Sequence, residues 1–112
     1  SSRVQSVRWS QDGRRLASCA YDRTARIWYP ERSTDPQNSF ALKGHTDTVD
    51  QLCWDPTHPD RLATASGDKT VRIWDARTIR CIHTIPTDGE NINICWSPDG
   101  KHIAVGNKVG MA

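Results

Sequence analysis

The sequence lacks any long hydrophobic run. Among its 112 residues, no stretch approaches the roughly 18–20 consecutive apolar residues that a membrane-spanning helix requires. A charged segment followed by an apolar one, as in a secretory signal, is absent as well. No segment repeats its apolar residues with the period of an amphipathic helix. We therefore expect a globular chain without helices and without a membrane partner.

The sequence also has little excess charge of either sign. The chain has 15 lysines and arginines against 13 aspartates and glutamates, which leaves a formal net charge of +2. This charge is too small to argue for a nucleic-acid partner by itself. A loose population of arginines favours surface salt bridges over an RNA-binding track: Arg14, Arg15, Arg23, Arg26, Arg72, Arg77 and Arg80.

Spacings typical of metal ligands are missing too. His58, His83 and His102 are scattered, and we interpret them as solvated surface residues. The cysteines contain no Cys-x-x-Cys pair, and no phosphate-binding loop is recognisable. The sequence therefore predicts no metal, no cofactor and no small-molecule substrate. We expect all four cysteines to be small, buried, reduced residues of an intracellular protein: Cys19, Cys53, Cys81 and Cys95.

What the sequence does contain is a repeated strand–turn–strand unit. In the stretch from Leu62 to Asp75, small apolar residues are followed by the polar turn 67–69 and then by β-branched and aromatic residues. Residues 18–30 repeat this pattern at an offset of 46 from residues 64–76. A second series, Trp9, Trp54 and Trp96, has spacings of 45 and 42. All 5 tryptophans therefore belong to two repeat positions.

These units resemble the WD40 repeat, which forms one four-stranded blade of a β-propeller. The pair Gly44-His45 opens a unit and Trp74-Asp75 ends it, within the roughly 40–45 residues of one repeat. The resemblance implies an all-β fold. Because propellers close with roughly 4–8 blades, we expect about two and a half blades of a longer, seven-bladed propeller.

We place the blades as follows. Residues 1–42 are the first blade, which lacks its N-terminal Gly-His pair, and residues 43–86 are the second. Residues 87–112 are the first half of a third, truncated blade. Apolar residues fall on both faces of the expected strands, which is typical of sheets that are covered on both sides.

The resemblance also implies a structural hydrogen-bond network. In the second blade it would join His45, Thr64, Asp68 and Trp74. The same residue types could suggest a hydrolytic site, but a catalytic triad has no reason to recur in each blade, so we predict no enzyme. The first blade repeats part of the set, and the third has other residues at these positions. The first-blade members are Ser18, Asp22 and Trp28, and the third-blade residues are Thr87, Val105 and Val109.

Two stretches have a closer resemblance. Residues 46–82 and 89–108, the latter with the unusual run Gly-Glu-Asn-Ile-Asn-Ile-Cys-Trp, resemble the subunit 3 family of the THO complex. The resemblance implies a nuclear, non-catalytic scaffold subunit in the machinery that couples transcription to mRNA processing and export. Its partners would be other THO/TREX subunits, and its contact with RNA would be indirect.

An alternative function comes from another class of proteins. The run Trp74-Asp75-Ala76-Arg77 resembles the Trp-Asp-x-Arg box of WD40 substrate receptors of cullin-RING ubiquitin ligases. In that case Arg77, which follows an expected strand, would contact the ligase adaptor. Ala63 and Ala76 depart from the box, because larger aliphatic residues are usual at these positions.

Overall fold

The computed structural model describes residues 4–10, 13, 15–20, 23–28, 39–87 and 89–107. The side chains of residues 4, 5, 20, 39, 91, 92 and 107 are outside the description. Asp22 of the expected network also lies outside it, as do Val109, which stands at the corresponding position of the third unit, and residues 30–38.

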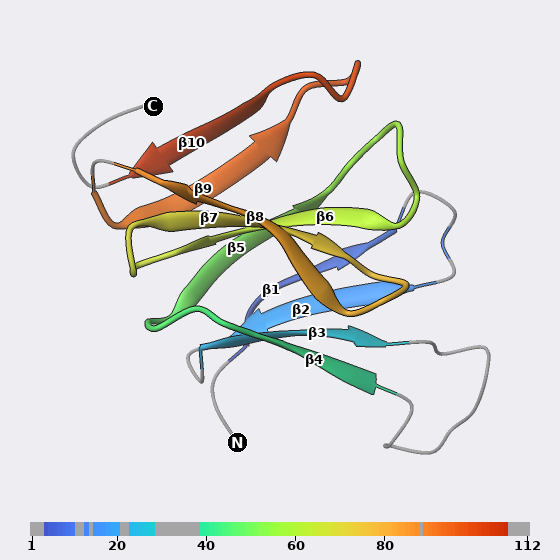
Figure 1. Cartoon of the computed structure of the whole chain (residues 1–112), viewed down its shortest axis with the longest axis horizontal. Coiled ribbons are helices and arrows are strands. Elements are labelled where there is room, and N and C mark those ends of the chain that lie inside the picture. Colours follow the sequence, from blue (N-terminus) through green and yellow to red (C-terminus); the bar gives the residue numbers. More distant parts are fainter. Residues whose placement is uncertain are drawn as a thin grey trace.

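The described residues form ten strands in three antiparallel sheets (Figure 1). The sheet orders are β1-β2-β3-β4, β5-β6-β7-β8 and β9-β10, so the predicted all-β fold is confirmed. In this part of the chain, no helix has the length and apolar character needed to cross a membrane. The strands are β1 Val4–Trp9, β2 Leu16–Ala20, β3 Thr24–Trp28, β4 Ser39–Lys43, β5 Val49–Trp54, β6 Arg61–Ser66, β7 Thr70–Asp75, β8 Arg80–Pro86, β9 Asn91–Trp96 and β10 Ile103–Asn107.

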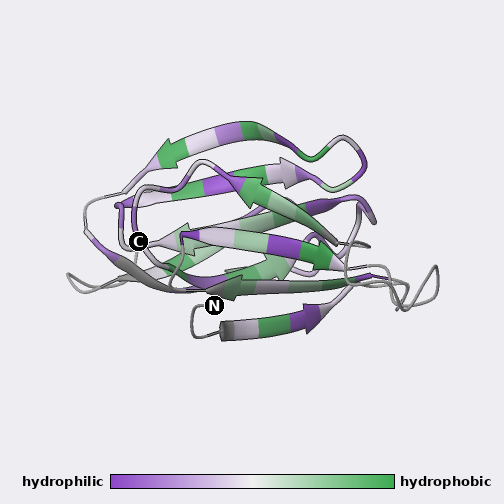
Figure 2. Cartoon of the chain, turned by 90° about the horizontal axis from the view of Figure 1, so that it is seen from below, coloured by the Kyte–Doolittle hydropathy of each residue, from purple (hydrophilic) through white to green (hydrophobic). Residues whose placement is uncertain are grey.

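The middle sheet is covered on both faces. Neighbouring residues of β6 belong to different hydrophobic clusters, because successive side chains of a strand point to opposite faces: Leu62 packs toward the first sheet and Ala63 toward the third. Figure 2 shows hydrophobic and hydrophilic residues in alternating bands along the strands. The first cluster contains Ala17, Cys19, Ala25, Ile27, Leu42, Val49, Leu52, Trp54, Leu62, Trp74 and Ala76. The second contains Ala63, Ala65, Val71, Ile73, Ile94 and Val105.

The three sheets span residues 4–43, 49–86 and 91–107. Each sheet places its sequence-adjacent strands side by side, as a hairpin-connected meander does. The division of the chain into blades at residues 42 and 86 stays a prediction.

The expectation that all four cysteines are buried was wrong for Cys95. Cys19 is buried, Cys53 and Cys81 are partly buried, and Cys95 is exposed; all four are free thiols. The preceding residue, Ile94, packs into the second cluster, so Cys95 lies on the opposite face of β9. None of the described elements covers that face.

The turn between β9 and β10 requires a glycine. Gly100 has a φ of 73°, a left-handed conformation that costs other residues roughly 1–2 kcal/mol. A β-carbon there would overlap the Thr57 hydroxyl and lie 3.0 Å from Asp55 Oδ1. This turn of the third sheet therefore rests directly on the β5–β6 connection of the second.

We expect Gly100→Ala to lower the free energy of unfolding by about 2–4 kcal/mol, because backbone strain and steric overlap add. Gly13→Ala is the matched control, since Gly13 has a φ of 71° and no atom within 4 Å of an added β-carbon. The control should lose only about 1–2 kcal/mol. Urea unfolding of the intact protein measures both, and equal losses would contradict this account of the contact.

Candidate interaction platform and its hydrogen-bond network

A chain of buried hydrogen bonds crosses the second sheet. Trp74 Nε1 donates to Thr64 Oγ1 over 2.8 Å. Thr64 Oγ1 lies 2.6 Å from His45 Nε2, and His45 Nδ1 lies 2.8 Å from Asp68 Oδ2. The chain thereby connects β7, β6, the loop before β5 and the β6–β7 turn.

The direction of the chain follows from the chemistry of its ends. An indole N–H can only donate, and a carboxylate can only accept. The consistent arrangement is therefore a neutral His45 whose Nδ1–H donates to Asp68 and whose Nε2 accepts from the Thr64 hydroxyl. Thr64 is 0% exposed, and the side chains of His45 and Asp68 are 1% and 5% exposed. These side chains are therefore largely shielded from solvent.

Burial and hydrogen bonding shift both titratable members of the network. Desolvation lowers the pKa of His45 below its ordinary value of 6.5, although the hydrogen bond to Asp68 opposes this shift. Burial alone would raise the pKa of Asp68. Hydrogen bonds from Thr70, His45 and the Thr46 N–H outweigh this effect, so the pKa of Asp68 is below 3.8.

The geometry of the network fits a structural role. The Thr64 hydroxyl is fully buried and already bonded to Trp74 and His45, so it is not available to attack a substrate. Asp68 also bonds Thr70 Oγ1 and the Thr46 N–H. We propose on these contacts that the network joins the strands and turns of the second sheet.

Among the described residues, the other sheets show less of this network. In the first, Trp28 Nε1 donates to Ser18 Oγ over 3.1 Å. In the third, Val105 is buried in the hydrophobic core at the position that corresponds to Thr64. Thr87 donates its hydroxyl to Gly89 O over 3.1 Å.

Sequence reasoning missed a polar contact between the first two sheets. Arg15 is only 7% exposed, and its Nη2 donates to Pro59 O over 2.8 Å and to Asp60 Oδ1 over 2.7 Å. Its guanidinium lies 5.5 Å from the centroid of the Trp54 ring, while Trp54 Nε1 donates to Arg8 O. The available signal was the repeat of an arginine where a strand starts, since Arg15 directly precedes β2 and Arg61 is the first residue of β6.

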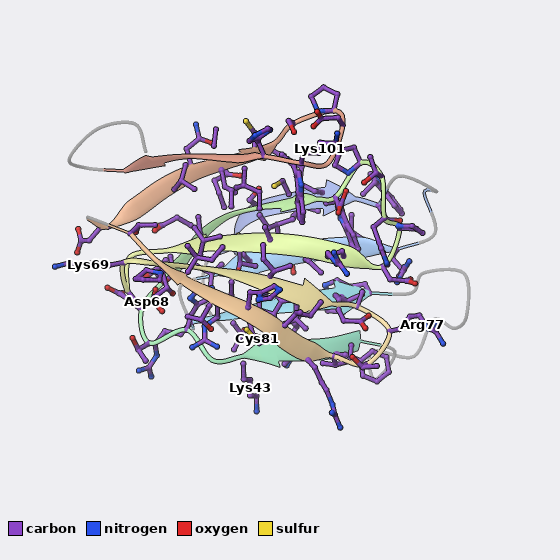
Figure 3. The ribbon with its side chains drawn as sticks, turned by 45° about the horizontal axis from the view of Figure 1, so that its top comes forward. Lys43, Asp68, Lys69, Arg77, Cys81 and Lys101 are labelled. Atoms are coloured by element: carbon purple, nitrogen blue, oxygen red, sulfur yellow. The ribbon has the colours of Figure 1, made fainter. Side chains whose placement is uncertain are left out.

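The remaining predicted residues lie on the surface. Arg77 is exposed, and its backbone N–H donates to Asp75 Oδ1 over 2.9 Å. Figure 3 shows Arg77 at the edge opposite Asp68 and Lys69. His58, His83 and His102 are exposed, and no group of three potential metal ligands occurs within the described ranges. The two edges of the sheets thus present charged side chains on a rigid support.

The family model of the WD domain, G-beta repeat, matches residues 1–29, 36–75 and 79–108. The chain belongs to the WD40 family. Each of the second and third matches starts at the outer strand of one sheet, β4 or β8, and continues into the next sheet. A WD40 repeat of this chain therefore links two neighbouring sheets covalently.

Known proteins extend this comparison. The WD40 chain is 55% identical over 107 residues to THO complex subunit 3 of Arabidopsis thaliana, which covers 95% of the chain and 34% of that relative. This finding confirms the predicted resemblance. The chain is also 37% identical over 99 residues to anaphase-promoting complex subunit cdc20 of Dictyostelium discoideum, covering 87% of the chain and 20% of that relative.

A solved structure gives the same fold. A chain in the crystal structure of a mitotic checkpoint complex matches with a TM-score of 0.84 and 31% identity, over 94% of this chain and 33% of that one. The present chain therefore spans about a third of the length of its THO relative and of this structural neighbour.

We expect His45→Ala to lower the free energy of unfolding by about 2–4 kcal/mol, because it leaves Thr64 and Asp68 without their partner in a buried site. Partner affinity should change little, since the His45 side chain is 1% exposed. Thermal unfolding and a binding assay on the intact protein measure the two effects. His83→Ala, at an exposed histidine, is the control, and unchanged stability with lost binding would refute the structural role.

The network also predicts how stability depends on pH. The unfolded chain binds a proton at His45 below pH 6.5, whereas folded His45 has a lower pKa. Its contribution is therefore fully present above that pH and decreases as the pH falls, by at most about 1.4 kcal/mol per unit. Urea unfolding at pH 7.5 and 5.5 should show this loss in the wild type and a smaller one in His45→Ala. Equal pH dependence in both would exclude His45 as the source.

Proposed function

We propose that this WD40 chain belongs to a non-catalytic scaffold subunit of the THO complex, which couples transcription to mRNA processing and nuclear export. The observation that carries this proposal is the 55% identity to THO complex subunit 3 over 95% of the chain. The scaffold acts in the nucleus and through protein–protein contacts. Its partners are other THO/TREX subunits, and its association with RNA is indirect.

The structure supports a platform role in two ways. Buried polar contacts hold the sheets in a fixed arrangement, both within the second sheet through His45 and between the first two sheets through Arg15. The turns at the two edges carry exposed charged side chains, such as Lys69 and Arg77. A rigid support with variable edge residues suits the binding of other proteins.

A second candidate function is that of a substrate receptor of a cullin-RING ubiquitin ligase. The specific observation is the geometry of the Trp74–Arg77 segment. Ala76 is buried and its N–H donates to Asp60 O over 2.7 Å, so the following residue, Arg77, is held in an exposed turn. The similarity to a subunit of the anaphase-promoting complex indicates that related WD40 chains occur in more than one type of assembly.

Affinity purification of the intact protein from RNase-treated nuclear extract, followed by mass spectrometry, tests both candidates. We expect THO subunits to be recovered despite RNase, and Arg77→Ala to leave their recovery unchanged. Arg80→Ala is the matched control, because Arg80 is an exposed arginine three positions away. Recovery of a cullin-RING adaptor that is lost only in Arg77→Ala would establish the receptor function instead.

A further inference from the structure

Two arginines have equivalent positions at the starts of β2 and β6. The carbonyl of Arg15 accepts from the Ser10 N–H, and the carbonyl of Arg61 accepts in the same way from the Asp55 N–H. Both point toward the next sheet, since they share a strand face with Ala17 and Ala63, respectively. Their surroundings nevertheless differ.

At the first junction, between the first and second sheets, the arginine has two acceptors on the neighbouring sheet. Arg15 reaches the carbonyl of Pro59 and the carboxylate of Asp60 in the β5–β6 turn. The carboxylate oxygen is 2.7 Å away, and the side chains are 9% and 23% exposed. A guanidinium that pairs with a carboxylate and a carbonyl in a partly dry site forms strong, charge-assisted hydrogen bonds.

At the second junction, between the second and third sheets, the corresponding carboxylate is missing. The residue equivalent to Asp60 is Lys101. Asp60 directly precedes Arg61 and Lys101 directly precedes His102, and the carbonyls of Arg61 and His102 accept the hydrogen bonds that close the two turns. The carbonyl of Gly100 already accepts from Trp96 Nε1 over 3.0 Å. Among the described residues, Arg61 Nε is buried and has no hydrogen-bond partner, as is also true of Arg72 Nε. A buried donor without a partner requires an explanation, and an acceptor supplied by another molecule would provide one.

The nearby carboxylates are engaged elsewhere. Asp75, opposite Arg61 in the β6–β7 ladder, accepts from the Arg77 N–H. Asp99 accepts from Ser97 Oγ and the Lys101 N–H. Asp55 Oδ1 accepts from the N–H and the hydroxyl of Thr57. None of them forms an ion pair with Arg61 within the described ranges.

Arg61 and Lys101 belong to the same edge of the molecule. The β9–β10 turn rests on the β5–β6 connection, because an added β-carbon at Gly100 would lie 3.0 Å from Asp55 Oδ1. Lys101 is exposed. Figure 3 shows it at the tip of the β9–β10 turn, remote from Asp68 and Lys69 at the opposite edge and from Lys43 on β4. The edge therefore combines a partly buried guanidinium with an exposed ammonium group.

We propose that this second junction binds an aspartate or glutamate side chain of a partner protein, held by Arg61 and Lys101. This inference rests on the proposed scaffold function and specifies the chemistry of one contact. A single carboxylate is the favoured ligand because the equivalent Arg15 binds a carboxylate. Asp75 and Asp99 would repel the successive phosphates of an RNA strand.

Lys101→Asp tests the proposal by restoring, within the chain, the acceptor that Asp60 provides at the first junction. The new carboxylate should pair with Arg61, raise the melting temperature and occupy the binding site. We expect the recovery of the carboxylate-bearing partner from RNase-treated extract to fall about tenfold. Lys43→Asp is the matched control, an identical charge change at an exposed lysine on another part of the surface, and should leave recovery unchanged.

Zero-length cross-linking of the unmodified protein in its native complex is the second measurement. A carbodiimide activates a carboxylate, and an amide bond forms with a lysine amine that contacts it. We expect an amide between Lys101 Nζ and an aspartate or glutamate of a co-purified protein. Mass spectrometry identifies both joined peptides.

The outcomes separate this proposal from the scaffold function. Recovery of THO subunits that is unchanged in Lys101→Asp, even with a raised melting temperature, overturns the proposal and leaves the scaffold function intact. Equal losses in Lys101→Asp and Lys43→Asp also overturn it, as a general charge effect. Ultraviolet cross-linking of the 97–102 turn to RNA, or the absence of any Lys101 cross-link to another protein, overturns it whichever complex is recovered.

Discussion

The structure depends on one constraint. A sheet that is covered on both faces must find hydrogen-bond partners for its buried polar groups within the protein. Trp74 carries an indole N–H into the core between the first and second sheets, where no water is available. Thr64, His45 and Asp68 continue the hydrogen bonds from there to the turns. An unpaired donor in such a position costs roughly 1–3 kcal/mol. The network therefore links burial of the aromatic side chain to the position of two turns.

The same constraint acts at the junctions between sheets, with different solutions. At the first junction Arg15 and Trp54 each donate a hydrogen bond to the neighbouring sheet, so polar contacts and apolar packing both connect the two sheets. At the second junction Trp96 donates within its own hairpin, and Arg61 Nε is buried without a partner among the described residues. Apolar packing of Ile94 and Val105 against the second sheet stabilises this junction. A repeat architecture can therefore keep its sheets while the contacts at its edges diverge.

That divergence is where a scaffold acquires its specificity. The buried residues of a WD40 sheet are limited by packing against two neighbours, whereas turn residues such as Lys69, Arg77 and Lys101 face outward. The chain is similar both to THO complex subunit 3 and to a cdc20 protein. Similarity to subunits of two different complexes agrees with this division between buried sheet residues and outward-facing turn residues. We therefore expect partner choice to depend on the exposed edges.

Much of the fold followed from the sequence alone, because repeat spacing and turn chemistry are local properties. The repeat spacing and the WD40 resemblance predicted an all-β chain of four-stranded units, and the resemblance suggested which residues to place in the hydrogen-bond network. The burial of Arg15 and the exposure of Cys95 were decided only by the tertiary structure. Alternation along a strand indicates which side chains share a face, but not whether a neighbouring sheet covers it. The acceptor of Arg15 lies 45 residues away in the chain, so no local pattern identifies it.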